Sequence, residues 1–135
     1  MAFLVDTSVF IAIERQGIPA ESVLIHSRGE PMALSAVTVS ELLIGIHRTI
    51  NDGQRHDRES FVARVLELLP VLSFDLRAAR VHSAIYADLQ ARGQTIGAHD
   101  LLIGATAIAN GYVVLTSNLR DFQRIPGLEV RQPLG

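Results

Sequence analysis

The sequence predicts an α/β fold in which helices cover both faces of a mostly parallel central sheet. Apolar segments of four to six residues alternate with longer segments whose apolar residues recur at helical spacing. The short segments are apolar at nearly every position, which is typical of parallel strands buried on both faces. Because no linker composition divides the 135 residues, we expect a single domain over 1–135.

The N-terminal half predicts two units in which a strand leads into a helix. The apolar strand at 2–5 turns at residues 6–8 into the helical pattern VFIAIER. Glycine and proline at 17–19 and at 29–31 bound a further helical segment. The expected strands are 2–5 and 32–35, and the expected helices are 9–15, 21–28 and 38–50.

In the C-terminal half, the polar stretch NDGQRHDRES at 51–60 is expected to be a turn. It leads into an apolar-periodic helix that Pro70 ends, and a later helix is expected to end at Gly93. Residues 118–127 are expected to form a loop or a short helix. The remaining expected helices are 61–69, 75–92 and 96–111, and the remaining strands are 71–74, 112–117 and 128–132.

Composition excludes several classes of function. The absence of cysteine excludes disulfides, thiolate zinc sites and a cysteine nucleophile, and it favours the cytoplasm. No apolar run approaches the roughly 18 residues that span a bilayer, so no membrane segment is expected. The sequence also lacks a G-x-S-x-G turn, a Walker A loop and a G-x-G-x-x-G loop, which disfavours serine hydrolases and nucleotide-dependent enzymes.

The charge pattern leaves the question of a nucleic-acid partner open. A net charge of −2 provides no global basic field to attract a polyanion. However, all twelve basic residues are arginine, whose planar side chain binds phosphate with two hydrogen bonds. An arginine bias of the genome explains the same composition equally well.

Three acidic residues stand in apolar surroundings. Asp6 ends a strand, Glu41 is embedded in AVTVSELLIGI, and Asp100 precedes LLIGATAIA. Each has an ordinary structural interpretation, because Asp6 can cap a helix, Thr38 and Glu41 fit a T-x-x-E capping box, and Asp100 can complement a helix dipole. All three nevertheless lie where a strand or turn is expected to lead into a helix.

The predicted topology can bring these acids together. Helices that follow parallel strands begin at the carboxyl edge of the sheet, and the strand expected to end near Thr116 delivers Asn118 and Asp121 to the same edge. Carboxylates about 4 Å apart repel by about 4 kcal/mol per pair at an effective dielectric constant near 20. Such a cluster takes up protons or binds a cation. Ligands that are all oxygen favour Mg²⁺ or Mn²⁺, as in phosphoryl-transfer enzymes.

Two further residues have open roles. His99 is adjacent to Asp100 and can contact substrate or transfer a proton, but a surface or capping histidine is the commoner case. Arg48 can reach a phosphate group or lie on a solvated helix face.

Four segments together resemble the PIN domain, and more narrowly the VapC toxins of type II toxin–antitoxin systems. The segments are LVDTSVFIA at 4–12, SAVTVSELLIGI at 35–46, IGAHDLLIGATAIANG at 96–111 and VVLTSNLRDF at 113–122. The resemblance implies a three-layer α/β/α sandwich with a mostly parallel sheet. It also implies a ribonuclease that uses Mg²⁺, or Mn²⁺, to hydrolyse single-stranded or loop RNA, often transfer RNA.

The resemblance also implies roles for individual residues. The metal-binding and catalytic acids of the family fall on Asp6, Glu41 and Asp100. A fourth, more variable position falls on Asn118, and Asp121 is a further candidate. The family positions whose hydroxyl groups orient the carboxylates or bound water fall on Thr7, Ser8 and Thr116.

The resemblance further implies a homodimer and a VapB-type antitoxin partner that covers the active-site groove, in a higher assembly. Two alternatives remain at this point. One is a PIN nuclease of RNA processing or DNA repair outside a toxin–antitoxin pair. The other is a catalytically silent PIN-like binding module in which the acids are caps, and Asn118 is the one feature that favours it.

Overall fold

The central sheet is fully parallel, with the strand order β3-β2-β1-β4-β5. The structure is a computed structural model and describes residues 1–134, so the last residue of the expected domain lies outside it. Each of the five expected strands is present but short. The strands are β1 Phe3–Val5, β2 Met32–Ser35, β3 Val71–Leu72, β4 Val113–Leu115 and β5 Val130–Arg131.

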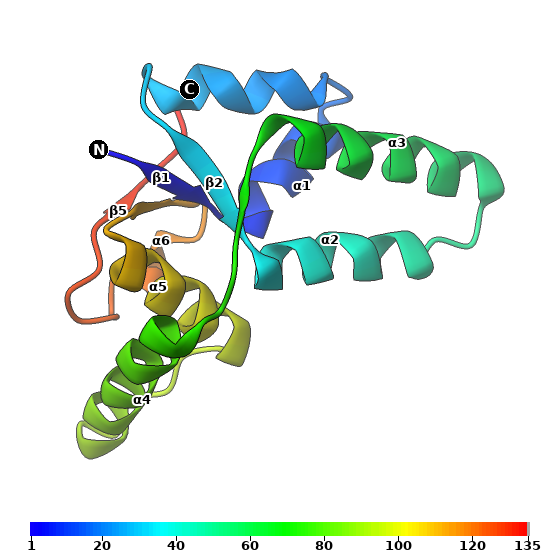
Figure 1. Cartoon of the computed structure of the whole chain (residues 1–135). Helices are drawn as coiled ribbons and strands as arrows, with labels where there is room; N and C mark the ends of the chain where they lie inside the picture. The colour runs from blue at the N-terminus through cyan, green and yellow to red at the C-terminus, as the bar shows by residue number, and fades with distance from the viewer. Residues whose placement is uncertain (135) are drawn as a thin grey trace.

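Helices cover the sheet on both sides, as Figure 1 shows. Alternate strand residues face opposite sides, so Val5 and Leu34 join one core cluster while Leu4 and Val114 join the other. The first cluster packs under α1 Thr7–Arg15, the 3₁₀ segment η1 Ala20–Ser27, α2 Ala36–His47 and α3 Asp52–Leu68. The second packs under α4 Leu76–Ala91, α5 Ala98–Asn110 and α6 Leu119–Phe122. The predicted three-layer α/β/α sandwich is therefore confirmed.

The prediction of a turn at 51–60 is wrong, because α3 already begins at Asp52. Asn51 caps the helix with its side-chain oxygen, which accepts a hydrogen bond of 3.0 Å from the Gln54 N–H. Arg58 fastens this polar part of α3 to the neighbouring helices through the Glu14 carboxylate (3.1 Å) and the Gly45 carbonyl (3.0 Å). Hydrophobic periodicity cannot reveal a segment that side-chain hydrogen bonds hold in place.

None of the helices within residues 1–134 combines the length and the apolar character of a candidate bilayer span. The longest, α3, has 17 residues and is polar over its first half.

Replacing the cap of α3 tests where this helix begins. Asn51→Ala should lower the free energy of unfolding by about 1 kcal/mol, because the backbone N–H of Gln54 loses its acceptor. Urea denaturation followed by circular dichroism measures the change. Asn51→Ser is the matched control and should keep most of the stability. Equal stability of the alanine variant and the unmodified chain would contradict the assigned cap.

Candidate active site

The candidate site lies where the order of the strands reverses. From β1 the chain adds β2 and β3 on one side, and then crosses to add β4 and β5 on the other side of β1. In open parallel sheets, ligands bind at the carboxyl ends of the strands at such a switch point. Asp6 directly follows β1, and Thr116 directly follows β4.

Asp6 is a buried carboxylate held by two neighbouring hydroxyl groups. Only 5% of the residue is exposed. Its Oδ2 accepts hydrogen bonds from Ser8 Oγ (2.7 Å), Thr116 Oγ1 (2.9 Å) and the Ser8 N–H (3.4 Å). Asp6 therefore caps α1, as the structural interpretation proposed. Since these bonds all go to Oδ2, Oδ1 stays available to a ligand.

The two hydroxyl groups on Asp6 are themselves held by the chain that follows β4. Ser8 Oγ accepts from the Ser117 N–H at 3.1 Å, and Thr116 Oγ1 accepts from the Asn118 N–H at 2.9 Å. The segment after β4 is thereby fastened to the start of α1, although the two are more than 100 residues apart in the sequence.

The structural interpretation of Thr38 and Glu41 as a capping box is wrong. The cap of α2 is Ser35, whose Oγ accepts from the Thr38 N–H at 3.1 Å, so the helix begins at Ala36, two residues before Thr38. Thr38 is buried, and Thr7 Oγ1 and Ser35 Oγ both lie 3.3 Å from its hydroxyl oxygen. Glu41 consequently lies in the second turn of α2 and is free for another role.

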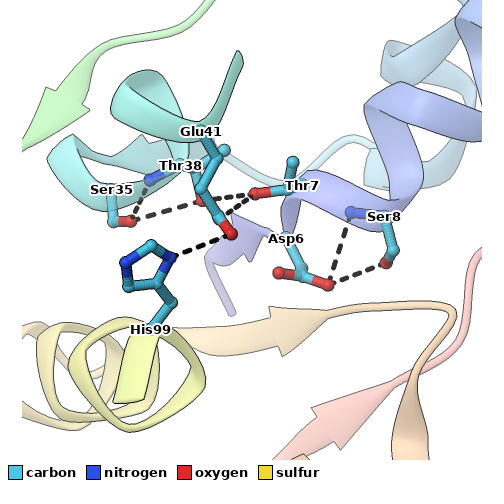
Figure 2. A network of polar contacts seen from close by, with 7 residues as sticks. All are labelled: Asp6, Thr7, Ser8, Ser35, Thr38, Glu41 and His99. Carbon is cyan, nitrogen blue, oxygen red and sulfur yellow. Dashed lines mark hydrogen bonds and ion pairs between the residues drawn. The ribbon is translucent and has the colours of Figure 1, made fainter. Parts of the chain in front are cut away.

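Glu41 is held at both carboxylate oxygens, as Figure 2 shows. Oε1 accepts a hydrogen bond of 2.5 Å from Thr7 Oγ1. Oε2 lies 3.2 Å from His99 Nδ1. Three elements, α1, α2 and α5, meet at this one side chain.

Asp100 lies in the first turn of α5 and is surrounded by negative charge. The pKa of its carboxyl is raised to about 6, first by burial and then by the like charges of Asp6, Asp121 and Glu41 in that order, while His99 opposes them. These three acids thus lie within electrostatic reach of Asp100. A cation placed among them would relieve this repulsion.

The structure brings Asp121 toward the cluster, since its charge acts on Asp100 from the first turn of α6. Asn118 directly precedes this short helix, makes no capping hydrogen bond with its side chain, and is exposed. Arg48 ends α2 on the solvent side, about 10 Å further along the helix axis than Glu41. The sequence did not reveal the contact between His99 and Glu41, although the position of His99 next to Asp100 had marked it as a candidate.

The donors present suit a hydrated hard cation better than a closed metal cage. Within residues 1–134, no three Asp, Glu, His or Cys side chains are already grouped tightly enough to enclose a metal. Mg²⁺ does not require such a group, because it keeps several of its waters and binds through one or two carboxylates. The free Oδ1 of Asp6 and the electrostatically crowded carboxyl of Asp100 fit that mode of binding.

The chain is thus an α/β protein with an all-parallel sheet and an acidic site at its switch point. The sequence profile of the PIN domain matches residues 3–128. Ribonuclease VapC1 of Rickettsia felis is 38% identical over 130 residues, which make up 96% of this chain and 95% of that protein. The chain therefore belongs to the PIN domain family, in its VapC group.

Two further comparisons also point to the VapC group. A tRNA(fMet)-specific endonuclease VapC of Salmonella typhimurium is 35% identical over 100 residues, 73% of each chain. The crystal structure of DNA-bound VapBC from the same species matches with a TM-score of 0.81 at 29% identity, covering 98% of both chains.

The raised pKa of Asp100 predicts a pH-dependent stability. Between the ordinary value of 3.8 and about 6, the folded state keeps a proton that the unfolded state releases, so the stability due to this group falls as the pH rises. Asp100→Asn is neutral at every pH. In EDTA it should therefore unfold at a higher urea concentration than the unmodified chain at pH 7.5, and this advantage should shrink by pH 4.

The matched control for this comparison is Asp57→Asn, which removes a charge from an exposed position of α3. It should show no such pH-dependent advantage. If the advantage of Asp100→Asn is the same at both pH values, the carboxyl is not electrostatically strained.

Proposed function

We propose that this chain is a Mg²⁺-dependent endoribonuclease and the toxin of a VapBC-type toxin–antitoxin pair. The observation that carries the proposal is the acidic cluster at the switch point, where the pKa of Asp100 is raised to about 6 among Asp6, Asp121 and Glu41. Relatives named ribonuclease VapC1 and tRNA(fMet)-specific endonuclease VapC support the reaction and the substrate class.

In the proposed site, Asp6, Glu41 and Asp100 would hold the cation partly through its retained waters, because no three side chains within residues 1–134 are grouped to enclose it directly. Asn118 and Asp121 would complete the shell of oxygen ligands. Mg²⁺ is the proposed ion and Mn²⁺ an alternative, because both prefer oxygen donors. PIN-domain ribonucleases generally depend on a divalent metal. When bound, the cation would supply an acidified water and offset charge on the scissile phosphate.

The chain itself contributes the fixed geometry of the acids. Ser8 and Thr116 hold Oδ2 of Asp6, so that Oδ1 points away from them toward the available ligand position. Thr7 holds Oε1 of Glu41. Hydroxyl groups suit this task because they donate to a carboxylate without neutralising its charge.

The proposed substrate is RNA, in particular transfer RNA or other structured RNA. Because the chain carries a net charge of −2, RNA phosphates would be bound locally by the cation and by arginine side chains. Transfer RNA is encountered in the cytoplasm, so the proposed activity belongs to that compartment.

The proposed partner is a VapB-type antitoxin. The support is the close structural match to the toxin–antitoxin complex VapBC of Salmonella typhimurium. A homodimer of this chain, joined to the antitoxin in a higher assembly, is part of the same proposal.

The reaction is tested with purified protein and total transfer RNA. We expect cleavage with Mg²⁺, none with excess EDTA, and a loss in Asp100→Asn at least as large as the roughly 10–100-fold that a lost supporting group costs at metal sites. Gel analysis of the RNA fragments measures the rate. Asp57→Asn is the control and should cleave normally.

Cleavage that survives both EDTA and Asp100→Asn would contradict the metal mechanism. Absence of cleavage with Mg²⁺, on every RNA supplied, would instead favour a silent binding module. Cleavage restricted to DNA would favour a repair nuclease.

The antitoxin is tested by co-expression. A small reading frame next to this gene should encode a protein that co-purifies with the chain and suppresses its ribonuclease activity at equimolar amounts. If the chain stays fully active in such a complex, or if the neighbouring gene product does not co-purify with it, the nuclease lies outside a toxin–antitoxin pair.

A further inference from the structure

His99 occupies a position from which it can control Glu41. It lies in the first turn of α5, directly before Asp100, while Glu41 lies in the second turn of α2. The two residues are 58 positions apart in the sequence, yet His99 Nδ1 and Glu41 Oε2 are separated by 3.2 Å. Among the residues that the structure describes, this is the one side-chain hydrogen bond between α2 and α5.

The chemistry of the two groups sets the direction of this bond. A carboxylate carries no hydrogen and can only accept, so Nδ1 of His99 must carry the hydrogen and donate it. This holds for the neutral imidazole as well as for the charged form. The His99 side chain is 55% accessible.

Glu41 needs such a restraint because of where it lies. Its charge is among those that repel Asp100, so an unrestrained Glu41 would rotate toward solvent, away from the other acids. Thr7 holds one carboxylate oxygen at 2.5 Å, and this leaves the carboxylate free to turn about that single bond. A second donor on the other oxygen fixes the plane of the group, and Figure 2 shows Thr7 and His99 on either side of Glu41.

We infer that His99 is a positioning residue, which holds Glu41 in the orientation that the proposed cation site requires. This inference rests on the proposed function. The first turn of α5 then has two tasks, since it carries Asp100 itself and also supplies the donor that orients Glu41. Any shift of α5 along its axis would displace Asp100 and the donor on Glu41 together.

The test compares His99→Ala with His99→Asn. The Asn side-chain nitrogen lies two bonds from Cβ, as Nδ1 does, so it can donate to Glu41 Oε2, but an amide cannot transfer a proton at neutral pH. His99→Ala should lower kcat and the affinity for Mn²⁺ by about tenfold, as the loss of an orienting partner does at metal sites, with KM for RNA changed by less than about twofold. His99→Asn should restore both kcat and Mn²⁺ affinity to within about threefold of the unmodified chain.

Mn²⁺ affinity is measured without RNA, by electron paramagnetic resonance of the free ion. His56→Ala is the matched control, since His56 is exposed on α3, and it should change nothing. Thermal unfolding followed by circular dichroism shows whether each variant is folded. A crystal structure of His99→Ala should show Glu41 turned away from Asp6 and Asp100 while its bond to Thr7 remains.

Two results would overturn the inference. One is a His99→Ala variant that matches the unmodified chain in both kcat and Mn²⁺ affinity. The other is an equal loss in His99→Ala and His99→Asn, which would show that the imidazole itself acts on substrate or proton. A failure of the proposed function looks different, because the unmodified chain would then neither bind Mn²⁺ nor cleave RNA, or Glu41→Gln would leave both unchanged.

Discussion

Repulsion among the carboxylates at the switch point is the constraint on which the rest of the site depends. Asp6, Glu41 and Asp100 carry like charges at the edge of an apolar core, and partial burial together with these charges raises the pKa of Asp100. Left alone, such groups would separate or take up protons. The surrounding structure opposes separation and keeps two of the acids in place with hydrogen-bond donors: the hydroxyl groups of Ser8 and Thr116 on Asp6, and Thr7 and His99 on Glu41.

The apolar layers provide that immobility. The strands that carry the site residues are almost completely buried, with Leu4, Val5 and Leu34 inaccessible to solvent. Fully burying a side chain of this size contributes about 1.5–3 kcal/mol, and closely packed cores resist small displacements. Helix α5 is likewise buried along most of its length behind Asp100. The apolar run that follows Asp100 therefore serves the site by fixing the axis of the helix that carries it.

The same arrangement explains why a chain of modest negative charge can be proposed as a ribonuclease. The acids that a cation requires are concentrated at one edge of the sheet, where each parallel strand ends and the next helix begins. Arginine side chains are available elsewhere on the surface for the phosphates of RNA. The proposed antitoxin would act where these acids gather, at the carboxyl ends of the strands.

Much of the fold could be predicted from the sequence. All five strands were placed correctly, since parallel buried strands are continuous apolar runs, and helices such as α4 and α5 show their period directly. The beginning of α3 was missed because its polar first turns are held by Asn51 and Arg58, and not by an apolar stripe. The start of α2 was misplaced because a T-x-x-E pattern resembled a cap, whereas Ser35 has that role.

Local pattern alone determined that Asp6, Glu41 and Asp100 are unusual, since each is an acid within an apolar segment. Only the tertiary structure decided which groups hold them, because those contacts join residues far apart in the chain. Thr116 and Asp6 are separated by 110 positions, and His99 and Glu41 by 58. Such pairs form because β4 returns to lie beside β1 and α5 returns to lie beside α2, and a strand order of this kind is not recorded in any short stretch of sequence.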